Sequence, residues 1–159
     1  MIATQPARAQ WYHRIPPPIW MLALLLDAYC IQNTYAWAST VYVRSLPLAV
    51  VLAVAGIGLA VWGERTFHAA GTEVMPASAT NKKVVTTGPF RFTRNPMYSG
   101  LILISLGIAI YVGTLPFFAV PVLVFLLCNY AFIPFEEAKM AAQHGALYTD
   151  YLARVRRWI

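Results

Sequence analysis

Apolar segments of membrane length recur along this chain of 159 residues and restrict its fold more than any other feature. Runs of about 18 apolar residues are typical of transmembrane helices. Only 11% of the residues are charged, whereas a soluble domain has about 25%. We therefore predict an all-α, integral membrane helical bundle that forms one domain over residues 1–159. Four spans are expected, at Pro18–Trp37, Leu46–Gly63, Met97–Val112 and Leu115–Phe135.

The basic residues predict how these spans are oriented. Eleven of the twelve Lys and Arg residues precede the first span, separate the second from the third, or follow the fourth, and only Arg44 falls on the other side. The positive-inside rule then places both termini in the cytoplasm. No cleavable signal peptide is expected. The net charge of +6 is assigned to contact with anionic lipid headgroups rather than nucleic acid, because the basic residues lie at membrane boundaries.

The segment Lys82–Gly100, with the sequence KKVVTTGPFRFTRNPMYSG, concentrates polar and turn-forming residues directly before the third span. Asn95-Pro96 is typical of a helix N-cap followed by the first helical residue, so the span should begin there. Gly113–Pro116 predicts a tight return, which makes spans three and four an antiparallel hairpin. The hairpin should bring Arg94–Tyr98 and Glu136-Glu137 to the same cytoplasmic face.

Polar groups at both ends of a membrane hairpin usually line a site. The free N–H groups of the helix start, with Arg94 beside them, suit a carboxylate or phosphate, although Arg94 would equally suit lipid headgroups. Glu136 and Glu137 oppose the dipole of the helix that they end, so a cation or a ligand should compensate them, unless that helix end is simply solvated. No third ligand has fitting spacing, and no metal is expected.

Three other features within the predicted spans have a functional and a structural interpretation. Asp27 is a functional candidate because intramembrane carboxylates are costly, or it is structural and bonded to a polar neighbour such as Asn129. Gly56-Ile57-Gly58 predicts close helix packing, or else the approach of a cofactor to the backbone. Cys30 and Cys128 are expected to be buried, unpaired thiols.

The signature of one enzyme superfamily is present in the polar segment. Residues 88–100, GPFRFTRNPMYSG, resemble the G-P-Y-R-x-x-R-[HN]-P-x-Y-x-G pattern of the isoprenylcysteine carboxyl methyltransferase and phospholipid methyltransferase superfamily. Arg65–Pro76 resembles its bacterial branch, and Tyr148–Trp158 is similar to the Y-x-x-Y-x-x-x-V-x-R-W ending of the family. The resemblance implies an S-adenosylmethionine-dependent methyltransferase in a bacterial inner membrane, with S-adenosylhomocysteine as its product.

The resemblance also implies where the cofactor lies. The pocket should face the cytoplasm and be formed by the connection 64–96. The C-terminal segment 136–159, which contains a cytoplasmic helix, should close it. Residues 1–17 are expected to form an interfacial lead-in. Arg94 and Tyr98 are the predicted catalytic residues. The residues assigned to the cofactor are Lys82, Val84, Val85, Gly88, Phe90, Arg94, Asn95, Pro96, Met97, Tyr98, Glu136 and Glu137.

The expected acceptor is lipophilic: a phospholipid amine, a prenyl-type carboxylate or a small thiol. Two departures from the family pattern bear on it. Asn95 stands where eukaryotic members have histidine, which argues against proton transfer by this residue. The arginine that prenylcysteine enzymes carry shortly before the glutamates is missing from Ala131–Pro134, which argues against a prenylcysteine carboxylate.

Two other function classes also describe a small membrane protein of this kind. A four-helix transporter of cationic compounds would use Asp27, and a non-catalytic membrane module would bind no cofactor. The connection Glu64–Pro96 favours an enzyme over a transporter, because its 33 residues exceed what a small exporter needs between two spans.

Overall fold

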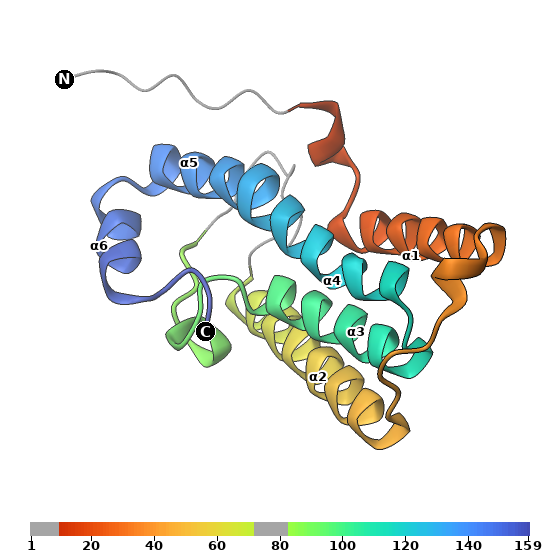
Figure 1. The fold of residues 1–159 in the computed structure, drawn as a ribbon. Coiled ribbons are helices and arrows are strands. Elements are labelled where there is room, and N and C mark those ends of the chain that lie inside the picture. The colour runs from red at the N-terminus through yellow and green to blue at the C-terminus, as the bar shows by residue number, and fades with distance from the viewer. Residues whose placement is uncertain (1–9, 72–82) are drawn as a thin grey trace.

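The structure is a computed structural model that describes residues 10–71 and 83–159, and all regular elements in these residues are helices (Figure 1). The prediction of an all-α fold is therefore confirmed for the described residues. The α-helices are α1 (Pro17–Thr34), α2 (Leu46–Ala70), α3 (Pro96–Val112), α4 (Leu115–Leu127), α5 (Ile133–His144) and α6 (Ala146–Arg154). Short 3₁₀ turns lie at Trp11–Arg14, Ala36–Ser39 and Gly88–Arg91, and a π-helical turn at Cys128–Phe132 joins α4 to α5.

Two continuous helical segments among the described residues are long and apolar enough to cross a membrane, namely Leu46–Ala70 and Leu115–His144. Only 17% of the most apolar stretch of α2 is buried, so its apolar side chains face outward, as they do in a helix surrounded by lipid. Helix α3 is apolar but shorter. Helix α1 contains Asp27 and is not among the two segments, so the number of four spans remains a prediction.

Helices α2 and α3 lie side by side along a seam of small residues (Figure 1). A Cβ atom added to Gly56 would lie 2.5 Å from the carbonyl oxygen of Gly100, and one added to Gly107 would lie 2.8 Å from that of Ala49. Only glycine allows the two backbones to approach so closely. The packing interpretation of Gly56 is confirmed, whereas a Cβ atom added to Gly58 would meet nothing within 4 Å, because it points away from the seam.

The predicted hairpin between α3 and α4 is confirmed. Helix α3 ends at Gly113, whose φ of 84° is in the left-handed region that glycine favours. The Gly113 carbonyl accepts a hydrogen bond from the backbone N–H of Tyr42 (2.9 Å), and the hydroxyl of Thr114 donates to Oε1 of Gln32 (2.6 Å). The end of α1 and the segment that follows it therefore support the turn.

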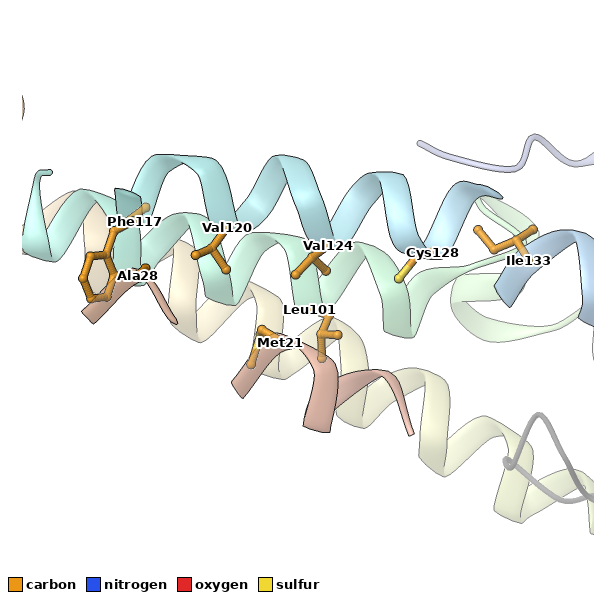
Figure 2. Packing of buried hydrophobic residues seen from close by; sticks show 9 residues of the cluster. Met21, Ala28, Leu101, Phe117, Val120, Val124, Cys128 and Ile133 are labelled. Atoms are coloured by element: carbon orange, nitrogen blue, oxygen red, sulfur yellow. The ribbon is translucent and has the colours of Figure 1, made fainter. Parts of the chain in front are cut away.

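The apolar core lies between α1, α3 and α4 (Figure 2). Its buried members are Met21, Ala28, Leu101, Ala109, Phe117, Val120, Val124, Cys128 and Ile133. Cys128 is buried as predicted, but the prediction for Cys30 is wrong because this thiol is exposed on α1. Helix α1 packs against α4 on one face only, and Cys30 lies outside that face.

The helix that begins at Leu115 does not end at Phe135 but continues through the π-helical turn to His144. Pro134 lies in the first turn of α5 and has no N–H to give to the preceding turn, and its ring would clash with a carbonyl there in a regular α-helix. The wider π-helical turn directly before α5 accommodates this proline. An extra residue in a helix rotates all later side chains by about 100°, so the turn sets the direction of Glu136 and Glu137.

Candidate functional site

A cavity of about 370 Å³ lies where the start of α3, the segment before it, α2, α5 and α6 meet. Cavities of this size, about 300–1,000 Å³, hold small molecules and cofactors. Ten of the predicted cofactor residues line it: Val84, Val85, Phe90, Arg94, Asn95, Pro96, Met97, Tyr98, Glu136 and Glu137. Segments some forty residues apart in the sequence thus meet at one place, as the hairpin predicts.

Two of the predicted cofactor residues are not among those that line the cavity. Gly88 packs against α2, where an added Cβ atom would lie 2.8 Å from the Thr66 hydroxyl, and its φ is +59°. This glycine therefore supports the loop rather than the cavity wall. Lys82 lies outside the described residues.

The prediction that the connection from residue 64 and the C-terminal segment border the pocket named no individual residue there, and the cavity has eleven lining residues that were not predicted. The additional lining residues are Pro16, Pro17, Pro18, Ala60, Glu64, Phe67, Leu101, Lys139, Met140, Tyr148 and Tyr151. Tyr148 and Tyr151 could have been found, because a spacing of three places both on one face of a helix. The contribution of Pro16–Pro18 has no comparable signal.

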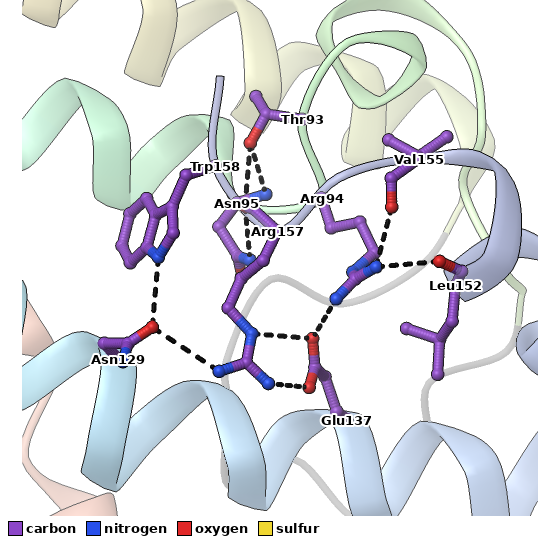
Figure 3. A network of polar contacts seen from close by, with 9 residues as sticks. All are labelled: Thr93, Arg94, Asn95, Asn129, Glu137, Leu152, Val155, Arg157 and Trp158. Carbon is purple, nitrogen blue, oxygen red and sulfur yellow. Dashed lines mark hydrogen bonds and ion pairs between the residues drawn. The ribbon is translucent and has the colours of Figure 1, made fainter.

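Arg94 is held on three sides at the wall of the cavity (Figure 3). One terminal nitrogen donates to the carbonyls of Leu152 (3.0 Å) and Val155 (2.6 Å), and the other to Oε1 of Glu137 (2.8 Å). Its side chain is 13% exposed. The buried Nε–H has no acceptor among the described residues, and buried donors are rarely left unpaired. The Nε–H is therefore a donor that no described residue engages.

Glu137 lies between two arginines (Figure 3). Arg157 places Nη2 2.5 Å from Oε2 of Glu137 and Nε 3.3 Å from Oε1, opposite the contact with Arg94. The expected compensation of Glu137 by a cation is therefore confirmed, and two arginines provide it. The amide oxygen of Asn129 accepts from the Trp158 indole (3.0 Å) and from Arg157 (3.4 Å).

The partner considered for Asp27 is thus engaged elsewhere, since Asn129 faces the C-terminal segment. Asp27 itself is exposed on α1 and is not one of the lining residues of the cavity.

The C-terminal segment is also tied to the loop before α3 through its backbone. The Arg157 carbonyl accepts from the Thr93 hydroxyl and from the Asn95 side-chain amide, each at 3.0 Å, and the Arg94 N–H donates to the Arg156 carbonyl (2.9 Å). Helix α3 begins at Pro96 as predicted, with Asn95 at the N-cap position. The Asn95 side chain does not cap the helix, because its amide points to the C-terminal segment.

Tyr98 and Glu136 form the second polar pair of the cavity wall. The Tyr98 hydroxyl donates to Oε1 of Glu136 at 2.5 Å, which joins the start of α3 to α5. This hydrogen bond engages Oε1 of Glu136, and Glu136 is one of the residues that line the cavity. Lys139, one turn further along α5, also lines the cavity. Among the described residues, no group of three His, Cys, Asp or Glu side chains could hold a metal ion.

Tyr151 fixes α6 to the 3₁₀ turn Gly88–Arg91, because its hydroxyl donates to the Phe90 carbonyl at 2.8 Å. Burial raises the pKa of Tyr151 to about 12, although Arg94 lowers it. The folded protein keeps this proton while the unfolded chain releases it near pH 10, so stability falls as the pH rises from about 10 to 12.

Tyr151→Phe is expected to cost about 1 kcal/mol of the free energy of unfolding at neutral pH, because the Phe90 carbonyl is left unpaired. The variant should also show a smaller loss of stability between about pH 10 and pH 12. Denaturant unfolding across this pH range checks both effects. An identical pH slope in the two proteins would contradict the role of this hydroxyl.

Comparison with protein families gives one match to the chain. Residues 45–146 match the family model described as phospholipid methyltransferase, which is 102 of the 159 residues. The match begins at the N-cap of α2 and includes the loop before α3, Tyr98 and both glutamates. No curated protein and no solved structure was found to match the chain.

Proposed function

We propose, because the chain belongs to the phospholipid methyltransferase family, that it transfers a methyl group from S-adenosylmethionine to a lipid-type acceptor at the membrane. Members of this family are methyltransferases, and the two long apolar helices agree with a membrane protein. The observation that carries the proposal is the cavity itself. Its lining includes Glu136 and Arg94, whose buried Nε–H has no acceptor among the described residues, and a zwitterionic ligand needs an acidic and a basic partner of this kind.

Each part of the cavity wall has a group that suits the cofactor. The Nε–H of Arg94 would bind the carboxylate. The carboxylate of Glu136 would accept from the ammonium group or a ribose hydroxyl, and Val84, Val85 and Phe90 would border the nucleoside. When bound, S-adenosylmethionine supplies an activated methyl group on a positively charged sulfonium. A tyrosine ring near such a cation stabilises it by about 0.5–2 kcal/mol, which is the role proposed for Tyr98.

The residues of the chain would contribute position and exclusion of water rather than a covalent step. The hydroxyl of Tyr98 is fixed by Glu136, and the guanidinium of Arg94 is fixed by Glu137, so neither group must reorganise during the reaction. Holding two reactants in line contributes up to about 7–11 kcal/mol to lowering a barrier. Arg94 and Tyr98 remain the proposed catalytic residues, with the role of holding the reactants in position.

The acceptor is proposed to reach the cavity along its apolar wall. Pro16–Pro18, Met97 and Leu101 contribute apolar surface beside the polar groups. The family description favours a phospholipid amine over the prenyl-type carboxylate and the small thiol. The transporter alternative depends on Asp27, which lies away from the cavity wall, and it is not proposed further.

We also propose a bundle of four spans in a bacterial inner membrane, with both termini and the cavity on the cytoplasmic side. The distribution of basic residues supports this orientation. Arg44, which alone falls on the other side in the sequence, donates from Nε to the Tyr111 carbonyl near the end of α3 (2.7 Å). That end is opposite to the cavity, which lies at the start of α3.

Calorimetric titration of S-adenosylhomocysteine into the purified protein tests the cofactor site. The wild type should bind with a saturable isotherm, and Glu136→Gln should bind at least tenfold more weakly, because a hydrogen bond to a charged group contributes about 1.5–3 kcal/mol. Its melting temperature should stay near that of the wild type, since glutamine can still accept from Tyr98.

Asp27→Asn is the matched control, because it makes the same chemical change on α1 outside the cavity and should leave the affinity unchanged. Absence of binding in folded wild-type protein would overturn the proposed function. Equal affinity of Glu136→Gln and the wild type would remove Glu136 from the cofactor site.

A further inference from the structure

His13 is a buried polar residue that the proposed mechanism does not use. It lies in the 3₁₀ turn Trp11–Arg14 that precedes α1, and it is 4% exposed. Its Nδ1 accepts from the backbone N–H of Gln10 (2.9 Å), and its Nε2 lies 3.1 Å from the carbonyl oxygen of Ala131. Since Nδ1 accepts, Nε2 carries the proton and donates to Ala131. The imidazole therefore links the segment before α1 to a carbonyl 118 residues later.

That carbonyl belongs to the π-helical turn Cys128–Phe132. The turn sets the direction of the two glutamates, because an extra residue rotates the helix that follows by about 100°. A regular α-helix through Pro134 would direct Glu136 away from Tyr98. A donor fixed to the turn therefore stabilises the arrangement on which the cavity depends.

The His13 ring also contacts the residues that lead directly to the polar pair. It stacks on Phe135, with ring centroids 4.1 Å apart and an angle of 17° between the planes, and Glu136 is the next residue. It meets Phe132 edge-on, with centroids 5.6 Å apart. Phe132 in turn lies 6.5 Å from the Tyr98 ring. His13 is thus connected by packed rings to both members of the Tyr98–Glu136 pair.

We propose that His13 is a positioning residue, which holds the π-helical turn by its bond to Ala131 and its stack on Phe135 and so places Glu136 against Tyr98 in the cofactor site. The inference rests on the proposed function. The same anchor fixes the chain just before Pro16–Pro18, which form part of the cavity wall. No contact of His13 with the cofactor or the acceptor is required.

The test is a double-mutant cycle measured by titration of S-adenosylhomocysteine. His13→Phe keeps a ring against Phe135 but removes the donor, and its affinity should fall about fivefold, the equivalent of one hydrogen bond. In a Tyr98→Phe background, where the polar pair is already broken, the same change should cost less than twofold. This dependence of the His13→Phe effect on Tyr98 is the readout that a purely structural residue would not show.

Further variants distinguish loss of the hydrogen-bond donor from loss of folding. His13→Gln retains a donor at the reach of Nε2, and His13→Met has the same length without one, so glutamine should bind more tightly than methionine. Thr114→Val is the control: it removes another buried side-chain hydrogen bond, that to Gln32, at the opposite end of α3, and should bind like the wild type.

The outcomes separate the inference from the proposed function. If the wild type does not bind S-adenosylhomocysteine, both are overturned. If the wild type binds and His13→Phe binds within twofold of it, only the positioning role is overturned. The positioning role is also overturned if His13→Phe loses fivefold in both backgrounds, or if the glutamine and methionine variants bind equally.

Discussion

Glu137→Gln is expected to destabilise the protein by about 3 kcal/mol, because removal of one partner from a buried ion pair leaves uncompensated charge. Two arginines would lose their counter-ion, and Glu137 itself is only 16% exposed. At roughly 2–4 °C per kcal/mol for a chain of this length, the melting temperature should fall by about 10 °C. Thermal unfolding in detergent, followed by the circular dichroism of the helices, measures the change.

The comparison with Glu136→Gln makes the prediction specific. The two adjacent glutamates are expected to behave differently. Glu136→Gln should weaken binding of S-adenosylhomocysteine at least tenfold and leave the melting temperature unchanged, whereas Glu137→Gln should mainly lower the melting temperature. Asp150→Asn, an exposed carboxylate on α6, should do neither. A Glu137→Gln protein that melts with the wild type would show that its two ion pairs contribute nothing to the fold.

Gly56→Ala is the second substitution with a large expected effect. The new methyl group would lie 2.5 Å from the Gly100 carbonyl oxygen and 2.9 Å from Cγ1 of Ile104, so α2 and α3 must move apart. Overpacking of this kind costs about 1–3 kcal/mol. Binding of S-adenosylhomocysteine should weaken as well, because Ala60 and Pro96, on the same two helices, form part of the cavity wall.

Gly58→Ala is the matched control, two residues away on the same helix. Nothing lies within 4 Å of its added methyl group, and alanine is favoured over glycine in a helix by about 1 kcal/mol. The Gly58→Ala protein should therefore be as stable as the wild type or more so. If both alanine variants melt at the same temperature, the close approach of α2 and α3 does not contribute to stability.

The elements that sequence predicted are those fixed by neighbouring residues. The start of α3 at Pro96 and its end at Gly113 follow from local backbone preferences. The hairpin then brings the start of α3 and the two glutamates to the same end of the bundle, and most of the predicted cofactor residues line one cavity.

The parts that were missed depend on contacts between distant residues. Pro134 indicates an irregular helix, but nothing near it in the sequence shows that the irregularity will be a π-helical turn. His13 bonds to Ala131, and Arg157 bonds to Glu137 and Asn129, only because the tertiary fold brings them together. Asn95 is a residue type that caps helices through its side-chain oxygen, yet its amide nitrogen donates to the Arg157 carbonyl, and this bond orients the side chain away from the helix start.

The hydrogen bonds between the loop before α3 and the C-terminal segment have a consequence for how the protein is made. Chains are synthesised from the N-terminus at about 5–20 residues per second, so Arg94 emerges well before residues 152–157, which supply its carbonyl partners. The apolar helices can enter the bilayer during this interval, while the guanidinium still lacks those acceptors. Insertion and completion of the cavity are therefore separate events, and the contacts that hold Arg94 at the cavity wall form only after that segment has been translated.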